Sequence, residues 1–216
     1  MRPFILSAIM NRIVLEDIAK RYAREWIFRG VNLELTKGRS YVILGSNGSG
    51  KSTLLQVIAS YLTPTKGKLH YYEGAREIPI EQVYHQLSVA SPYMELIEEF
   101  TLREYLQFHS RLKAFYADMT VDEVIKVLEL EQAGDKQLSN YSSGMKQRVK
   151  LGTAILTQSD LLLLDEPTSN FDAKAITWYR DLVQQYRKER ILLICSNHIA
   201  AEYDFCEQEI VMEDYK

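Results

Sequence analysis

The chain has 216 residues, of which 46% are hydrophobic and 25% charged, and it carries a formal net charge of −3 at pH 7. This composition is typical of a compact globular domain and excludes a largely disordered chain. The acidic balance excludes a general electrostatic attraction to nucleic acid, so no nucleic-acid partner is expected. Apolar runs of about five residues are far shorter than the ~20 that a membrane-spanning helix requires.

The chain opens with MRPFILSAIM, which has neither a credible cleavage site nor an adequate apolar core for a signal peptide. Patterned sequence begins at residue 11 with NRIVLED. We therefore predict one domain over residues 11–216. Residues 1–10 are predicted to be a poorly ordered or non-native start, with Met1 and Met10 as alternative initiators.

Residues 11–45 alternate apolar and polar positions, which predicts half-buried antiparallel strands at the edge of a sheet. Later apolar runs lack strict alternation and predict parallel strands that are covered on both faces. These runs are 41–44, 87–90, 161–164 and 191–195, and helical patterns follow or separate them at 52–62, 145–158 and 173–189. The alternation predicts an α/β fold with a mainly parallel core sheet and an N-terminal antiparallel β subdomain.

The middle of the chain, from about 92 to 145, has helical spacing and no strand signal. Two T-x-x-E capping boxes begin predicted helices there, Thr101 with Glu104 and Thr120 with Glu123. We predict a helical subdomain that is inserted into the α/β domain.

The segment GSNGSGKS at 45–52 matches G-x-x-x-x-G-K-[ST] and lies between a predicted strand and a predicted helix. Glycines allow successive N–H groups to face inward, and the helix start adds its positive end, so the segment is a cradle for phosphate. Lys51 is expected to reach the β and γ phosphates, and Ser52 to coordinate Mg²⁺. The predicted nucleotide-binding residues are Gly45, Ser46, Asn47, Gly48, Ser49, Gly50, Lys51, Ser52 and Thr53.

The segment LLLLDEP at 161–167 places two adjacent acids at the end of a predicted buried strand. Ligands of open α/β sheets bind at this edge. Asp165 is expected to hold Mg²⁺, directly or through water, and Glu166 to polarise the water that attacks the γ phosphate. In isolation the same residues are equally explained by an exposed acidic turn.

The segment YSSGMKQR at 141–148 resembles the LSGGQ-x-Q-R signature of the ATP-binding cassette family, with changes at the first, third and fifth positions. Taken alone, it is also explained as an N-capped amphipathic helix. The order of phosphate loop, helical insertion, signature, acidic strand and a later histidine extends the resemblance over about residues 11–213. The resemblance implies a P-loop NTPase that uses ATP and Mg²⁺.

In that family two cassettes pair head to tail, so the resemblance implies a second cassette, here a homodimer in the ATP-bound state. Ser142, Ser143 and Gly144 would contact a γ phosphate held by the partner. Asp172, in SNFD, would link the two sites, although it is equally explained as the N-cap of the following helix.

Two further residues take their expected roles from the resemblance. His198, in SNH, stands where the family's switch histidine contacts the γ phosphate and the attacking water. Tyr22 matches the aromatic residue that stacks on adenine, with Trp26 as the alternative.

The match is weaker at two positions. The family usually carries a glutamine that touches Mg²⁺ at the start of the helical subdomain, and by spacing it should lie within 91–93, where the chain reads SPY. Gln86 comes too early, which leaves a water or a residue such as Glu95 as the replacement. Met145 also replaces the glutamine of the signature.

The resemblance implies the ATPase subunit of a transporter, attached at the cytoplasmic face of the membrane to a separate integral membrane permease. The helical subdomain is the expected contact, with Phe100, Tyr105, Phe108, Phe115 and Tyr116 as candidates. Two alternatives stay open: a soluble cassette that acts on ribosomes or DNA, and a P-loop kinase for a small molecule.

Overall fold

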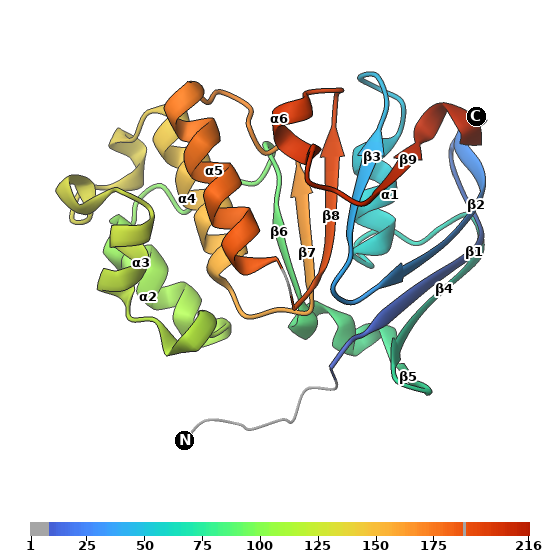
Figure 1. Cartoon of the computed structure of the whole chain (residues 1–216), viewed down its shortest axis with the longest axis horizontal. Helices are drawn as coiled ribbons and strands as arrows, with labels where there is room; N and C mark the ends of the chain where they lie inside the picture. The colour runs from blue at the N-terminus through green and yellow to red at the C-terminus, as the bar shows by residue number, and fades with distance from the viewer. Residues whose placement is uncertain (1–8, 188) are drawn as a thin grey trace.

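The computed structural model describes residues 9–187 and 189–216, which form two sheets with helices around them (Figure 1). The first sheet is antiparallel, has the strand order β2-β1-β4-β5, and consists of β1 (Arg12–Tyr22), β2 (Glu25–Thr36), β4 (Lys66–Glu73) and β5 (Arg76–Ile78). The second sheet is parallel and has the order β6-β7-β8-β3-β9. Its strands are β3 (Ser40–Leu44), β6 (Leu87–Ala90), β7 (Leu161–Asp165), β8 (Ile191–Ser196) and β9 (Gln208–Val211).

The parallel core sheet and the antiparallel subdomain confirm the predicted fold class. One detail of the prediction is wrong, because the antiparallel strands form a sheet of their own and do not extend an edge of the core sheet. Strands β4, β5 and β9 were not predicted.

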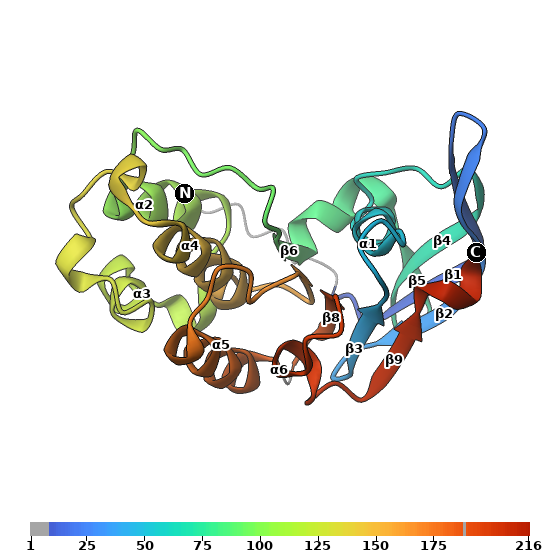
Figure 2. The same cartoon turned by 90° about the horizontal axis from the view of Figure 1, so that it is seen from above.

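The core sheet is buried on both faces because side chains alternate along each strand. On β3, Val42 and Leu44 pack with the helices α2–α5, whereas Tyr41 and Ile43 pack with α1 and the antiparallel sheet. Figure 2 shows the two layers on opposite sides of the core strands. This double burial explains why the core strands read as continuous apolar runs.

Four longer helices and one short helix follow the predicted patterns. They are α1 (Lys51–Ile58), α2 (Leu102–Leu112), α3 (Val121–Val127), α4 (Ser143–Leu156) and α5 (Ala173–Tyr186). Thr101 and Thr120 cap α2 and α3, and both predicted capping boxes are formed. A further turn of helix, α6 (Ala200–Tyr203), follows β8. The helix predicted over 173–189 ends at Tyr186, and residue 188 lies outside the described residues.

The start of the chain is described only from residue 9, so the prediction for residues 1–8 lies outside the described residues. Met10 is fully buried. Its backbone N–H donates to Gln86 Oε1 at 3.0 Å and to Asp160 Oδ2 at 3.1 Å. No helix among the described residues is long and apolar enough to cross a membrane.

Candidate functional site

The phosphate-loop segment connects the carboxyl end of β3 to the start of α1 and lies beside a cavity of about 310 Å³. Gly50 takes the N-cap position of α1 with φ 104°, a left-handed conformation that favours glycine. A Cβ there would lie 2.6 Å from Cγ2 of Ile27, so a side chain is excluded. No side chain caps α1, which leaves its first N–H groups available to an anion.

Lys51 is buried at the first turn of α1. Its ammonium donates to the carbonyl oxygens of Gly45 at 2.7 Å and Ser46 at 3.1 Å. These bonds hold the positive charge against the loop. The charge, the loop N–H groups and the helix start together favour a phosphate chain.

Asp165 and Glu166 meet this loop because β7 runs parallel to β3 in the same sheet, so both strands end at the same edge. Asp165 is buried, and Glu166 lines the cavity. Glu166 has φ 44°, and its backbone N–H donates to the carbonyl of Cys195 at 2.9 Å. A left-handed glutamate is strained, and such strain is most often retained at functional positions.

Burial, with a smaller contribution from the charge of Glu166, raises the pKa of Asp165, while the Ser52 hydroxyl, the charge of Lys51 and the Ser91 hydroxyl act in the opposite direction. Asp165 Oδ1 is buried and has no hydrogen-bond partner among the described residues. A buried carboxylate oxygen beside a serine hydroxyl fits Mg²⁺, which prefers hard oxygen ligands and is usually held by one or two carboxylates and phosphate groups. The residues present therefore fit the expected metal.

All the predicted site residues lie within the described part of the chain, and some of them line the cavity while others do not. Eight of them line the cavity: Asn47, Gly48, Gly50, Lys51, Ser52, Thr53, Asp165 and Glu166. Gly45, Ser46 and Ser49 belong to the loop without lining the cavity. The remaining predicted residues, also outside the lining, are Tyr22, Ser142, Ser143, Gly144, Asp172 and His198.

Ser142 and Ser143 are exposed at the start of α4, where the Ser142 hydroxyl accepts the N–H of Met145 at 3.3 Å. Two later signature residues make contacts inside the chain. Gln147 donates to the carbonyl of Pro167 at 3.1 Å, and the guanidinium of Arg148 lies 4.6 Å from the ring centroid of Trp178. Gln147 and Arg148 thus join α4 to the loop after Glu166 and to α5.

Three other predicted residues lie at the surface. Asp172 caps α5, accepting the N–H of Ala175 at 2.8 Å, as its alternative interpretation expected. His198 is exposed just after β8 with φ 59°. Tyr22 is exposed at the end of β1, with the Lys20 ammonium 5.2 Å from its ring centroid.

Three lining residues, Ile27, Pro92 and Tyr93, were not predicted from the sequence. Ile27 carries no chemical signal because it is an ordinary strand residue. Pro92 and Tyr93 lie in the interval where a glutamine was expected, so the spacing identified the segment but not its residues. The metal-facing role suggested for Glu95 has no support in the lining, since Glu95 is not part of it.

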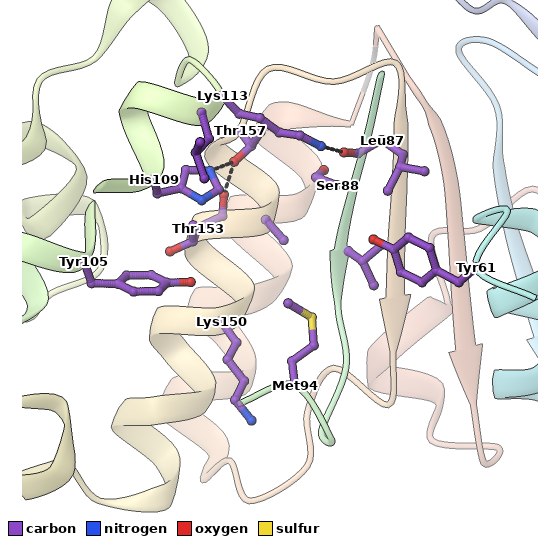
Figure 3. Close-up of a pocket in the computed structure, with 13 residues that line it drawn as sticks. Tyr61, Leu87, Ser88, Met94, Tyr105, His109, Lys113, Lys150, Thr153 and Thr157 are labelled. Atoms are coloured by element: carbon purple, nitrogen blue, oxygen red, sulfur yellow. Dashed lines mark hydrogen bonds between the residues drawn. The ribbon is translucent and has the colours of Figure 1, made fainter. Parts of the chain in front are cut away.

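A second cavity, of about 200 Å³, lies between the core sheet and the helical segment (Figure 3). Its lining includes Tyr61 after α1, Leu87 and Ser88 on β6, and His109 on α2. Three residues of α4, Lys150, Thr153 and Ala154, also line it. The His109 ring nitrogen Nε2 lies 2.8 Å from the Thr157 hydroxyl. The cavity is mainly apolar, and two lysines, Lys113 and Lys150, lie on its border.

Comparison with known proteins agrees with this geometry. The ABC transporter family model matches residues 28–169. The ABC transporter ATP-binding protein YcbN of Bacillus subtilis is 30% identical over 188 residues, covering 87% of this chain and 61% of YcbN. The bacitracin transport ATP-binding protein BcrA of Bacillus licheniformis is 29% identical over 194 residues, covering 87% of this chain and 62% of BcrA. The chain thus spans about three fifths of these two relatives.

Solved structures share the fold. The ATP-binding subunit of an ABC transporter superposes with a TM-score of 0.78 at 22% identity, covering 92% of this chain and 85% of that one. The dimeric structure of MJ0796, a bacterial ABC transporter cassette, gives 0.77 at 21% identity, covering 92% and 93%. With the family model matching most of its length and the phosphate loop facing the acidic strand end, this chain belongs to the ABC transporter family.

Proposed function

We propose that the chain is the ATP-hydrolysing motor of an ABC transporter. Residues 11–216 form one cassette with a helical subdomain over about 92–145. The observation that carries the proposal is the cavity in which Lys51, Ser52, Asp165 and Glu166 meet at one edge of the parallel sheet. This arrangement supports phosphate binding and hydrolysis in one place.

Binding of ATP is assigned to the phosphate loop, where Lys51 and the first N–H groups of α1 hold the β and γ phosphates. Ser52 and Asp165 would hold Mg²⁺, which neutralises charge on the phosphates when it is bound. Tyr22 is proposed to stack on the adenine, since aromatic faces bind flat bases without strict selection.

Hydrolysis is assigned to Glu166, whose carboxylate polarises the attacking water. A general base of this kind must stand within hydrogen-bond reach of the water, and the position of Glu166 in the cavity lining supports that. His198 follows the neighbouring strand β8 and is proposed to contact the γ phosphate and the same water.

A second cassette completes the site. Ser142, Ser143 and Gly144 begin α4, and the two serines are exposed and outside the cavity of their own chain. A helix start with exposed N–H groups binds anions. We propose that these residues close over the γ phosphate of a partner chain in a head-to-tail homodimer, and that Asp172 connects the two sites.

A membrane permease is the proposed partner at the second cavity, which holds this cassette at the cytoplasmic face of the membrane. Apolar side chains around it are exposed, with Leu112 at 68%, Tyr61 at 60% and Met94 at 40%. Lys113 and Lys150 add positive charge at its border, so the fitting occupant is a short cytoplasmic permease segment with apolar and acidic side chains. Of the aromatic candidates named above, Tyr105 lines this cavity, Phe108 is exposed and Phe115 is buried in the core.

The test is product analysis with purified protein, ATP and Mg²⁺. Release of inorganic phosphate, lost in Glu166→Gln, supports the motor. A phosphorylated metabolite in place of free phosphate would identify a kinase instead. Co-purification from detergent-extracted membranes tests the partner. Leu112→Asp should abolish co-purification of an integral membrane protein, whereas Ile80→Asp, at an exposed side chain outside this cavity lining, should not. Co-purification with ribosomes or DNA would favour the soluble alternative.

A further inference from the structure

The segment that follows β6 contributes Pro92 and Tyr93 to the lining of the cavity beside the phosphate loop. Ser91 precedes them and, like Glu95, is not itself a lining residue, but unlike Glu95 it contacts the buried carboxylate: its hydroxyl Oγ lies 3.5 Å from Oδ2 of Asp165. This is the interval in which the family's metal-contacting glutamine was expected and where the chain has none. A different oxygen donor thus stands beside the buried carboxylate.

The Ser91 hydroxyl is available for a further interaction. A separation of 3.5 Å is longer than a normal O–H···O hydrogen bond, so Asp165 binds this hydroxyl only weakly. The other carboxylate oxygen, Oδ1, is buried and has no partner among residues 9–187 and 189–216. Ser52 lines the same cavity as Asp165. Two serine oxygens and one carboxylate therefore converge, a hard oxygen set that suits a magnesium ion.

Two contacts fix the position of Ser91. Pro92 restricts the preceding residue to extended backbone conformations. Lys150, on α4, donates from its ammonium to the Pro92 carbonyl at 2.9 Å. Because α4 also begins with the signature serines, a single helix carries both the proposed contact to the partner site and the clamp on this segment.

The same segment reaches the second cavity. Pro92 lines the cavity beside the phosphate loop, and Met94, two residues later, lines the second cavity. Displacement of Met94 by an occupant of the second cavity would therefore act on Ser91 through only two intervening residues. The Lys150 contact lies between them on the segment and resists such a displacement.

We propose that the Ser91 hydroxyl faces the divalent cation beside Ser52 and Asp165, in the role that a glutamine has in related cassettes. Lys150 is the positioning residue that holds Ser91 there through the Pro92 carbonyl. This inference rests on the proposed function, because it concerns the metal that accompanies ATP.

The test measures Mn²⁺ binding by electron paramagnetic resonance, with ATP present and Glu166→Gln as the common background. Ser91→Ala should weaken Mn²⁺ affinity about 10-fold, the lower end of the range for residues that support a metal site. ATP affinity in EDTA should not change. Ser91→Gln should restore the Mn²⁺ affinity, and Ser110→Ala, which removes an exposed hydroxyl on α2, should have no effect.

Lys150→Met tests the positioning role with the same readout. It should weaken Mn²⁺ binding in the parent protein but have no further effect in Ser91→Ala, because residues that act through one contact are not additive. Additive losses would overturn the Lys150 assignment. Unchanged Mn²⁺ affinity in Ser91→Ala, or a Ser91→Gln protein as weak as Ser91→Ala, would overturn the Ser91 assignment. Failure of the parent protein to bind ATP would instead refute the proposed function.

Discussion

The phosphate loop and the signature segment are both rich in serine and glycine and both begin a helix, yet their surroundings differ. At the phosphate loop, Ser49 and Lys51 are buried and α1 has no side-chain cap. At the signature, Ser142 and Ser143 are exposed, and the Ser142 hydroxyl caps α4. The first segment has an acidic strand end facing it within the same chain, and the second faces outward.

Similar local sequence therefore lies in two different settings. The phosphate loop borders a cavity formed within one chain, whereas the signature serines are exposed outside that cavity, as the proposed contact with a second chain requires.

Removing the proposed base acts on the half of the site that one chain completes. Glu166→Gln keeps the shape of the side chain, so ATP binding should persist while phosphate release falls about 10²- to 10⁴-fold. Calorimetry would measure binding and a phosphate assay the turnover. Glu209→Gln, on the exposed edge strand β9, is the matched control. Undiminished phosphate release would remove Glu166 from this role.

Acid should lower the local stability of α2 and the end of α4 before it lowers that of the strands beside the phosphate loop. Burial, followed by the Lys113 charge, lowers the pKa of His109 to about 4. Between this pKa and the unfolded pKa of about 6.5, His109 is protonated in the unfolded chain but neutral in the folded one. The free energy of unfolding is therefore highest above about pH 6.5 and falls by up to about 3 kcal/mol as the pH drops toward 4.

Hydrogen exchange at pH 7 and pH 5, corrected for the intrinsic exchange rate at each pH, would measure this effect. Protection should fall first in α2 and the end of α4, and His109→Gln should reduce the pH dependence. His85→Gln, which changes an exposed histidine, should not. An equal loss of protection in β3 and β7 would show that the two regions do not differ in this way.

Loss of the buried ammonium should weaken nucleotide binding itself. Lys51→Ala removes charge-assisted bonds worth about 1.5–3 kcal/mol each, so ATP affinity should fall at least about 10-fold. Calorimetry would compare it with Lys68→Ala, an exposed lysine on β4. An isotherm like that of the parent protein would contradict the assigned role of Lys51.

The signature serine should show two separate effects. Ser142→Ala removes a helix cap and should cost about 1 kcal/mol of unfolding free energy, as should Thr120→Ala, which removes the cap of α3. Only Ser142→Ala should also reduce ATP-dependent dimerisation, measured by light scattering in the Glu166→Gln background. Equal dimerisation in both variants would leave Ser142 as a cap alone.

Much of the fold followed from patterns that depend on local physics. Apolar runs buried on both faces identified four of the five core strands, and T-x-x-E pairs located the starts of α2 and α3. Strands β4 and β5, with the sequence KGKLHYYEGAREI, are polar and partly exposed because only one face of their sheet packs on the core. Strand β9 is only four residues long at an edge. Such strands lack a strong hydrophobic period.

The candidate site was predictable where chemistry fixes residue types, as at Lys51 and Asp165. It was not predictable where packing between distant segments determines which residues line the cavity. Ile27 lines the cavity because β2 packs against Gly50, a contact between distant segments. Ser91 was within the interval considered, but its approach to Asp165 depends on β6 pairing with β7.

Mixing two inactive chains tests the central claim most directly. Lys51→Ala spoils the phosphate loop, and Ser142→Arg spoils the signature. A heterodimer of the two keeps one intact composite site, so the account predicts that part of the phosphate release returns on mixing. No recovery, despite heterodimers demonstrated by differential tagging, would contradict a site shared between two chains.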